Sequence, residues 1–354
     1  MRLWLLFAVL LALGQVAHGA SPDGRLARFE YDEPHMGTTF RVVLYADDAA
    51  LAVRASRAAF DRIADLDARL SDYREGSELM RACRLAVGTA VPVSPDVFRV
   101  LSIAQTLAVR TGGAFDVTVG ALTRLWRHAR RQGVLPESRE LEAARLVSGY
   151  PLLRLEEGTH AIRLEREGVR IDVGGIAKGY AADRALEALA RDGLTRAMVV
   201  AGGEMAVGEA PPDACGWRIA IAPLDPGRSP QHIVVSRAGV STSGDAEQFM
   251  EVDGVRYSHI LDARTGQPLT GRRAVTVVAP DATTSDMLAT AITVLGVPEG
   301  VRLADDYAAA ALVEVEASGP ATRREARSTR WTASGPAVGA QPAASRCGDG
   351  WVRP

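Results

Sequence analysis

Residues 161–191, AIRLEREGVRIDVGGIAKGYAADRALEALAR, contain the pattern that decides the fold. Apolar and polar side chains alternate over residues 161–165 and again over 169–173, which is typical of half-buried strands. The pair Gly174-Gly175 follows, and the residues from there to about 190 have helical spacing of apolar side chains. The stretch therefore predicts strands, then a glycine turn, then a helix.

The same patterns recur on both sides of this unit. Apolar periodicity predicts helices over residues 49–70, 96–110 and 284–295, and Pro95 suits the start of the second. Asp253-Gly254 between two β-rich segments predicts a hairpin. Further strands are expected over residues 38–45, 195–200, 217–222, 232–236, 275–279 and 309–315. Strands and helices mix throughout, which indicates an α+β protein.

Length and charge limit the class of protein. The chain has 354 residues, of which 47% are hydrophobic and 24% charged, so it has ample apolar material for a core, in one large domain or two fused ones. Its 41 basic and 43 acidic residues give a net charge of -2. No global positive field exists to hold a phosphate backbone, so we expect no nucleic-acid partner.

The two ends of the chain differ in composition from its centre. Arg2 precedes an apolar run over residues 3–13, and small residues surround position 19, which predicts a signal peptide over 1–19, cut after Gly19, and export to the periplasm. The alternative is an uncleaved anchor, although the run is short for a membrane span. Residues 317–354 are rich in Ala, Gly, Pro, Ser and Arg, and we expect a disordered basic tail there. The folded domain is thus predicted over 20–316.

The glycine turn carries the first candidate site. Asp172 ends a predicted strand, and Lys178 falls in the first turn of the following helix, where free N–H groups favour an anion such as phosphate. The spacing is neither that of a P-loop nor G-x-G-x-x-G. Lys178 is the only lysine in the chain, and every other basic position is arginine. A compact ammonium in a tight site is not freely replaced by a guanidinium, so this lysine is predicted to belong to a site.

A second candidate lies on the apolar helix over 284–295. Asp286 and Thr290 are four residues apart and project from one face. With a backbone carbonyl they would suit Mg²⁺ or Ca²⁺, which prefer oxygen ligands. From the spacing alone, an N-cap role for Asp286 and a back-bonded hydroxyl for Thr290 are favoured over a metal site.

A third candidate is a hydroxyl-rich turn over residues 241–245 followed by His259, which Asp262 and Arg264 flank. Such a group could hold a phosphate or supply a general base, although a lone histidine is more often structural. No G-x-S-x-G sequence is present, which disfavours a serine hydrolase.

Taken in order, nine segments resemble the ApbE family of FAD:protein FMN transferases. They are MGTTF (36–40), LSDYREGSEL (70–79), TGGAFDVTVGAL (111–122), IDVGGIAKGYAADRA (171–185), GGE (202–204), WRIAIAP (217–223), VSTSGD (240–245), RYSHILDARTGQP (256–268) and SDMLATA (285–291). The resemblance implies a duplicated T-fold-like α+β domain with antiparallel sheets packed by helices. It also implies Mg²⁺-dependent transfer of FMN from FAD to a threonine of an acceptor protein, with release of AMP.

The resemblance also assigns residues. Those implied to contact the FAD substrate are Met36, Tyr73, Ala114, Phe115, Asp116, Asp172, Lys178 and Ile260. Those implied to bind the metal are Gly175 through its carbonyl, Asp286 and Thr290, with Ca²⁺ as the alternative to Mg²⁺. Lys178 would stabilise charge in the transfer, and His259 is the expected proton acceptor, with Asp245 in reserve.

Two other activities fit the same pattern. A Mg²⁺-dependent FAD pyrophosphatase would use water in place of threonine and would give FMN and AMP. A non-catalytic exported flavin-binding protein would keep the nucleotide pocket without needing Asp286, Thr290 and His259 together. A membrane is expected as a partner only through proximity of the acceptor protein. The family often has tyrosine at the position of Ala246 and proline at that of Ala263, and Gly120-Ala121-Leu122 stands where GPL is common.

Overall fold

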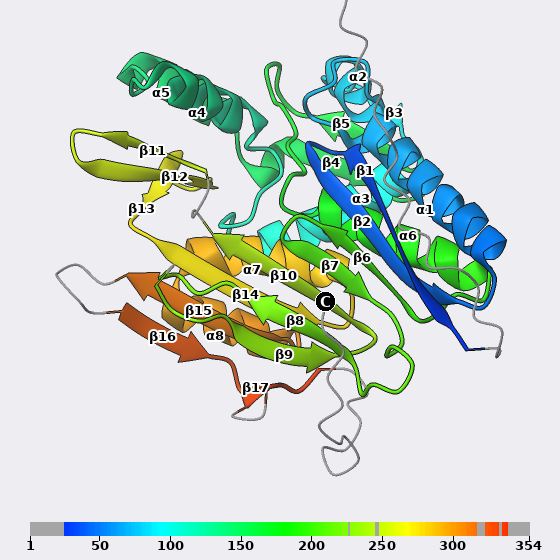
Figure 1. The fold of residues 1–354 in the computed structure, drawn as a ribbon. Coiled ribbons are helices and arrows are strands. Elements are labelled where there is room, and N and C mark those ends of the chain that lie inside the picture. The colour runs from blue at the N-terminus through cyan, green and yellow to red at the C-terminus, as the bar shows by residue number, and fades with distance from the viewer. Residues whose placement is uncertain (1–24, 226, 245–247, 317–322, 333–334, 339–354) are drawn as a thin grey trace, which may run out of the picture.

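The computed structural model describes residues 25–225, 227–244, 248–316, 323–332 and 335–338. Its largest element is an eight-stranded antiparallel sheet in the order β1-β2-β6-β7-β10-β14-β15-β16 (Figure 1). The strands are β1 (Ala27–His35), β2 (Thr38–Ala46), β6 (Ala197–Ala201), β7 (Glu204–Val207), β10 (Ala238–Gly244), β14 (Arg273–Ala279), β15 (Ala310–Glu316) and β16 (Arg323–Arg327).

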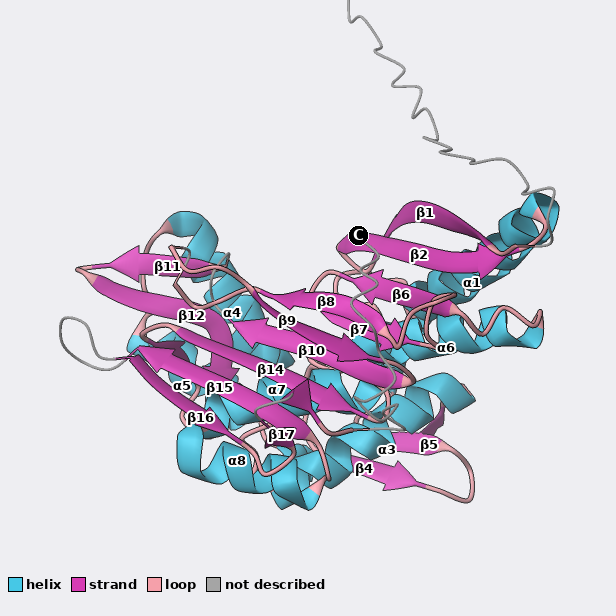
Figure 2. Ribbon diagram, turned by 60° about the horizontal axis from the view of Figure 1, so that its bottom comes forward, coloured by secondary structure: helices cyan, strands magenta, loops and turns pink. Residues whose placement is uncertain are grey.

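Helices cover one face of this sheet (Figure 2). They include α1 (Ala49–Leu70), α6 (Ala177–Arg191), α7 (Ala282–Leu295) and α8 (Val297–Asp306). Asp48 caps the first turn of α1 and Asp281 that of α7, each by accepting backbone hydrogen bonds. Fully buried side chains such as Phe40 and Leu44 of β2 and Ile63 of α1 fill the space between helices and sheet. This is the main core, and it fixes α6 beside α7.

A two-stranded ribbon packs on the opposite face of the sheet. It consists of β8 (Trp217–Ile221) and β9 (Gln231–Val235), whose inward side chains form a second apolar cluster with Val43, Val207 and Val240 of the sheet. The alternation of buried and exposed residues in both strands follows from this one-sided packing. The sheet is therefore covered on both faces.

A smaller layer stands beyond one end of the main sheet (Figure 1). It contains α4 (Gly120–Gln132), α5 (Ser138–Leu146) and the strands β11 (Phe249–Val252), β12 (Val255–Asp262) and β13 (Gln267–Thr270). Leu122, Trp126 and Leu261 belong to its own apolar cluster. The indole of Trp126 donates a hydrogen bond to the Gly266 carbonyl at 2.9 Å, which joins α4 to the β12–β13 turn.

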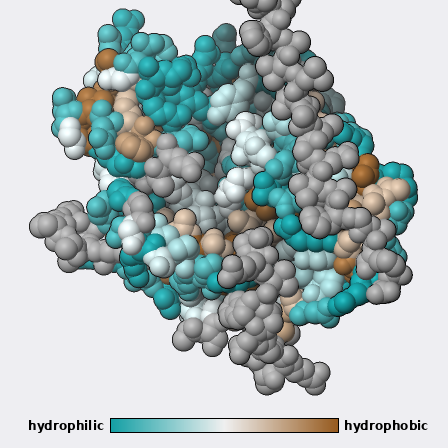
Figure 3. Space-filling model, viewed as in Figure 1, coloured by the Kyte–Doolittle hydropathy of each residue, from teal (hydrophilic) through white to brown (hydrophobic). Residues whose placement is uncertain are grey.

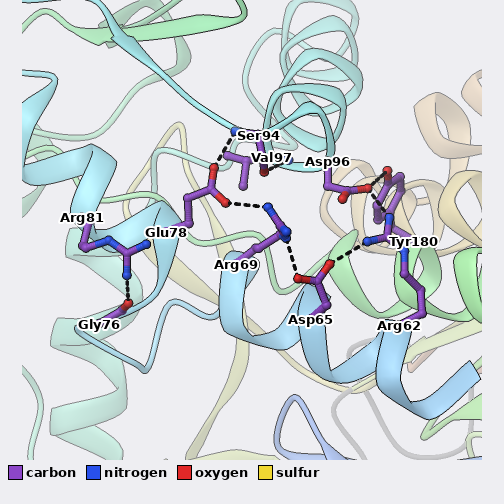
Figure 4. A network of polar contacts seen from close by, with 10 residues as sticks. All are labelled: Arg62, Asp65, Arg69, Gly76, Glu78, Arg81, Ser94, Asp96, Val97 and Tyr180. Atoms are coloured by element: carbon purple, nitrogen blue, oxygen red, sulfur yellow. Dashed lines mark hydrogen bonds and ion pairs between the residues drawn. The ribbon is translucent and has the colours of Figure 1, made fainter. Parts of the chain in front are cut away.

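The remaining elements complete the helical side. They are α2 (Glu78–Leu85), α3 (Pro95–Arg110), a 3-10 turn (Tyr150–Leu152) and a small sheet of β3 (Val91–Pro92), β4 (Leu153–Glu156) and β5 (Ala161–Leu164), with β17 (Trp331–Thr332) and β18 (Gly335–Pro336) near the end. Figure 4 shows how ion pairs tie α1 to its neighbours. Asp96 of α3 accepts from both Arg62 of α1 and the Tyr180 hydroxyl of α6, so α1 and the start of α6 are both tied to the start of α3.

The α+β class and antiparallel sheets are confirmed, and helix 49–70 is α1. The strand predicted over residues 169–173 is not present. These residues make one isolated bridge, from Arg170 to Val119. Their backbone bonds go to an irregular segment, with Asp172 N donating to Val117 O at 2.7 Å. Strand β1 was not predicted, since an edge strand carrying Glu, Asp and Pro lacks a clear hydrophobic alternation.

The prediction of a disordered tail over 317–354 is wrong for its described part. β16 pairs with β15 at the edge of the main sheet, and Trp331 is only 4% exposed in the second apolar cluster. Ladder hydrogen bonds stabilise β16, and composition does not reveal them.

The predicted signal peptide, 1–19, lies outside the described residues. Cys83 is a buried free thiol. None of the helices in the described ranges has the length and apolar character needed to cross a bilayer.

Candidate functional site

A cavity of about 1440 Å³ lies between the main sheet and the layer formed by α4 and β11–β13. This volume exceeds that of a typical drug-sized pocket and has room for a dinucleotide. The site residues predicted from the sequence line it together: Met36, Tyr73, Ala114, Phe115, Asp116, Asp172, Gly175, Lys178, His259, Ile260, Asp286 and Thr290. Asp245 lies outside the described residues, and the role of each residue remains a prediction.

The start of α6 forms the floor of the cavity. The Asp172 carboxylate accepts a hydrogen bond from Gly174 N at 2.8 Å and so shapes the glycine turn before the helix. One turn later, Lys178 Nζ donates to the Gly174 carbonyl at 3.2 Å and lies 3.5 Å from Glu204 Oε1. The lysine therefore points back over the helix start, where an anion would bind.

Helix α7 crosses α6 at this turn. Asp286, which is buried, accepts a hydrogen bond from Gly179 N at 2.9 Å through Oδ2 and still lines the cavity. A Cβ placed on Gly175 would lie 3.0 Å from Thr290 Oγ1, so the glycine turn and the threonine are in close contact. Asp281 is the N-cap of α7, which excludes that role for Asp286. The three predicted metal ligands thus come together from α7 and from the glycine turn before α6.

The position of α7 is fixed by a carboxylate of α6. Asp183 accepts hydrogen bonds from the backbone N–H groups of Ala282 and Thr283, both at 2.8 Å, and from the Thr283 hydroxyl. These N–H groups lie in the first turn of α7, where backbone N–H groups have no hydrogen-bond acceptor within the helix. Burial raises the pKa of Asp183 to about 6. The two helices are therefore locked in register by a residue two turns away from the cavity.

The electrostatics beside Lys178 favour a cation. Burial raises the pKa of Glu204 and of Asp286, and Lys178 offsets this only in part. Burial alone would lower the pKa of Lys178, but the two carboxylates outweigh it and raise that pKa. Glu204 Oε2 is sealed from solvent and accepts no hydrogen bond from any group in the described part of the chain. Because burial opposes ionisation of both carboxyl groups and one ammonium offsets this only in part, a divalent cation beside them would stabilise their charged forms.

The ligand types also fit a hard cation. Asp286, the Thr290 hydroxyl and the Gly175 carbonyl offer oxygen atoms alone, as Mg²⁺ and Ca²⁺ prefer. Across the described ranges no group of three or more His, Cys, Asp or Glu side chains is arranged to hold a metal ion. A site here would therefore rest on one carboxylate with neutral oxygen atoms, and Zn²⁺ is not suited to it.

Two loops form the inner wall. His35 and Thr38 pair across a two-residue hairpin in which Met36 has φ 48° and Gly37 φ 75°, so the left-handed turn directs the Met36 position toward the cavity. Phe115 is buried, and a Cβ on Gly175 would lie 3.3 Å from its ring. Asp116 accepts from both the backbone N and the hydroxyl of Thr118 at 2.7 Å, and burial raises its pKa.

Two residues that line the cavity, Arg127 and Glu204, were not singled out from the sequence. Arg127 of α4 donates to Asp72 at 2.6 Å and to Asp172 at 2.8 Å, and its guanidinium lies 4.3 Å from the centre of the Tyr73 ring. Glu204 belongs to the GGE segment but was given no role. No spacing marks Arg127 among the arginines of this chain; only the contact between three distant segments identifies it.

His259 lies on β12 at the outer part of the cavity. Its Nδ1 is 3.1 Å from the Gln248 carbonyl, which can only accept, so the neutral ring carries its proton on Nδ1 and its lone pair on Nε2. In this tautomer Nε2 is the atom that accepts a proton. His259 is exposed, which suits a group that meets a second substrate.

The fold and site define an α+β protein with a cavity of dinucleotide size, lined by a lysine and by oxygen atoms of the kind that hard cations prefer. The ApbE family model matches residues 36–313, which is most of the chain, and the chain belongs to this family. The recognition made from the nine segments is thus confirmed.

Curated relatives and solved structures agree with this assignment. An FAD:protein FMN transferase of Vibrio cholerae is 33% identical over 311 residues, covering 86% of this chain and 91% of the relative. One from Klebsiella pneumoniae is 33% identical, covering 75% and 78%. The structure of the flavin transferase ApbE from Vibrio cholerae has a TM-score of 0.76 at 31% identity and covers 86% of this chain and 98% of its own. The ApbE protein of Thermotoga maritima has a TM-score of 0.77 at 30% identity, with 86% and 97% covered.

Proposed function

We propose that this protein is an FAD:protein FMN transferase that moves FMN from FAD to a threonine hydroxyl of an acceptor protein and releases AMP. The observation that carries the proposal is the convergence of Lys178, Asp286 and His259 on one cavity of dinucleotide size. The family and the names of the curated relatives support the same activity and a transferase class.

The chain's own residues would divide the work as follows. The threonine oxygen attacks the phosphorus on the FMN side of the pyrophosphate, an O–P bond forms, and the bridging P–O bond breaks so that AMP leaves. His259 Nε2 accepts the threonine proton, because Nδ1 is already engaged with Gln248. Lys178, held between Gly174 and Glu204, faces the charge that develops on the phosphoryl oxygens.

Asp286, Thr290 and the Gly175 carbonyl would hold Mg²⁺, with Ca²⁺ as the alternative. The ion would neutralise the pyrophosphate and polarise the phosphorus. The raised pKa values of Glu204 and Asp286 support this proposal, because a divalent ion would stabilise the charged forms that burial disfavours. Asp172, Met36 and the wall formed by Phe115 would orient the nucleotide.

We also propose that the protein is exported and acts in the periplasm, on the strength of Arg2, the apolar run over 3–13 and the small residues before position 20. The matching experiment is to express the full chain with a C-terminal tag and determine the N-terminal residue of the secreted form. A new terminus at Ala20 is expected. Retention of Met1 on membrane-bound protein would favour the anchor instead.

The activity is tested by incubating the protein with FAD, Mg²⁺ and a threonine-bearing acceptor, then measuring acceptor mass, AMP and free FMN. We expect a mass gain equal to FMN, matched by AMP and abolished by EDTA. Asp286→Asn should lose at least about a hundredfold in rate, because a neutral amide binds a hard cation poorly. Asp306→Asn is the matched control, since Asp306 is an exposed residue of α8 outside the cavity.

The outcomes distinguish the transferase from the two alternative functions. AMP with free FMN and an unmodified acceptor would indicate a pyrophosphatase, and FAD that binds without cleavage would indicate a flavin-binding protein. An Asp286→Asn variant as fast as Asp306→Asn would refute the metal assignment.

A further inference from the structure

Arg127 is the one arginine of α4 that joins other segments of the cavity wall. Its two nitrogen atoms contact Asp72, from the loop after α1, and Asp172, from the segment before α6. These carboxylates belong to residues 100 positions apart in the sequence (172 minus 72). A quarter of the Arg127 side chain is exposed, against 12% of Asp72 and 8% of Asp172. The ion pairs are thus largely withdrawn from solvent and stronger than surface pairs.

The aromatic ring of Tyr73 is held by the same side chain. It lies 4.3 Å from the guanidinium carbon, within the range of a cation–π contact. Tyr73 is 72% exposed, an unusual state for a large aromatic residue in a folded chain, and it lines the cavity. An exposed ring held from one side by a guanidinium offers its remaining surface to another planar ring.

Arg127 also controls the charge of this wall. Burial and the neighbouring Asp172 raise the pKa of Asp72, and Arg127 opposes both effects. Without the guanidinium, two carboxylates would face each other at the edge of a site for an anionic ligand. A lysine would preserve the charge but could not bridge both acids and lie flat against Tyr73 at once.

We infer that Arg127 is a positioning residue for the flavin dinucleotide: it holds Asp172 and the Tyr73 ring as one face that receives a planar ring and neighbouring hydroxyl groups. The inference rests on the proposed function for the identity of the ligand. It concerns binding of FAD and not the chemical step, since Arg127 contacts Asp72, Asp172 and the Tyr73 ring and neither Lys178 nor Asp286.

The effect is measured as the dissociation constant of FAD, by quenching of flavin fluorescence, and as the rate of AMP release at saturating FAD. Arg127→Gln should weaken FAD binding by about tenfold or more, because it leaves the two acids unpaired and releases Tyr73. Arg127→Lys should weaken it less. The rate at saturation should stay within about twofold for both variants. Arg124→Gln is the matched control, an exposed arginine one turn earlier on α4 with unchanged binding expected.

A second substitution distinguishes positioning from general damage. Asp72→Asn combined with Arg127→Gln removes the repulsion that the single change creates, so part of the lost affinity should return. Urea unfolding of each variant checks that the fold is kept, and Arg127→Lys provides the test if the glutamine variant does not fold.

Three results would overturn the inference: FAD affinity in Arg127→Gln equal to that of Arg124→Gln, a fall in rate without a change in affinity, or no recovery in the double variant. Failure of the proposed function would show differently. A wild-type protein that binds FAD but transfers no FMN would refute the transferase and leave the Arg127 result valid. A wild type that binds no FAD would refute both.

Discussion

Gly179→Ala is the substitution whose effect the structure predicts most directly. Gly179 lies in the first turn of α6, where α7 crosses it. A Cβ at this position would be 2.2 Å from the Ala282 carbonyl oxygen and 2.8 Å from Asp286 Cβ. A carbon–oxygen contact needs more than 3 Å, so the helices must separate by about 1 Å. The obstacle is backbone, which cannot rotate away.

Two opposing effects determine the magnitude. Alanine improves helix propensity over glycine by at most about 1 kcal/mol. Overpacking of a close interface costs about 1–3 kcal/mol, and the upper end applies because the contact is with a carbonyl group. The steric cost exceeds the gain in helix propensity, and we expect a net loss of about 2 kcal/mol in the free energy of unfolding. The same separation stretches the Gly179 N to Asp286 Oδ2 hydrogen bond, so FAD and metal binding should weaken as well.

The assay is urea unfolding together with FAD titration. Gly158→Ala is the matched control, because Gly158 lies in the β4–β5 loop with ordinary φ and no atom within 4 Å of a new Cβ. That control should be neutral or stabilised by up to about 1 kcal/mol. If Gly179→Ala proved as stable as Gly158→Ala and bound FAD normally, the close crossing of α6 and α7 would be refuted.

Two further predictions concern charge. Lys178→Arg should reduce FMN transfer by at least about tenfold while leaving the unfolding free energy nearly unchanged, since a guanidinium cannot occupy the space between Gly174 and Glu204; wild-type rates would show that the ammonium has no special role. Asp183 has a folded pKa near 6 against 3.8, so its contribution favours the folded state below about pH 4 and is lost as the pH rises through 6, a change of about 3 kcal/mol. Denaturation from pH 4 to 8 should therefore show that wild type loses more stability than Asp183→Asn, and parallel curves would contradict this.

Local signals predicted a large part of the fold. The helices α1 and α7 follow from apolar periodicity, and in the structure each begins at an aspartate cap, Asp48 and Asp281. Residues 169–173 show the limit of this approach. Their alternation is real, because Val169, Ile171 and Val173 are buried, but their backbone pairs with a loop and not with a strand. Side-chain pattern reports burial, while strand formation depends on a partner that lies elsewhere in the chain.

The sequence likewise predicted only part of the candidate site. The glycine turn and Lys178 are contiguous, so their chemistry is visible in one segment. Arg127 acts only through Asp72 and Asp172, and nothing in its own neighbourhood distinguishes it from the arginines beside it on α4. The surface over α4 and α5 is mostly hydrophilic (Figure 3), which would suggest an ordinary solvated face.

The single lysine illustrates how the two kinds of information combine. Its uniqueness in an arginine-rich sequence indicated a site but not the reason for it. The structure supplies a reason: the ammonium lies between a carbonyl and a buried glutamate, with Asp286 close enough to raise its pKa. Burial raises the pKa of Glu204 to about 8 and also raises that of Asp286, so one ammonium does not suffice to keep both carboxyl groups ionised. A divalent cation held by Asp286 would stabilise their charged forms and would also neutralise a bound pyrophosphate, and this is the physical ground for proposing it.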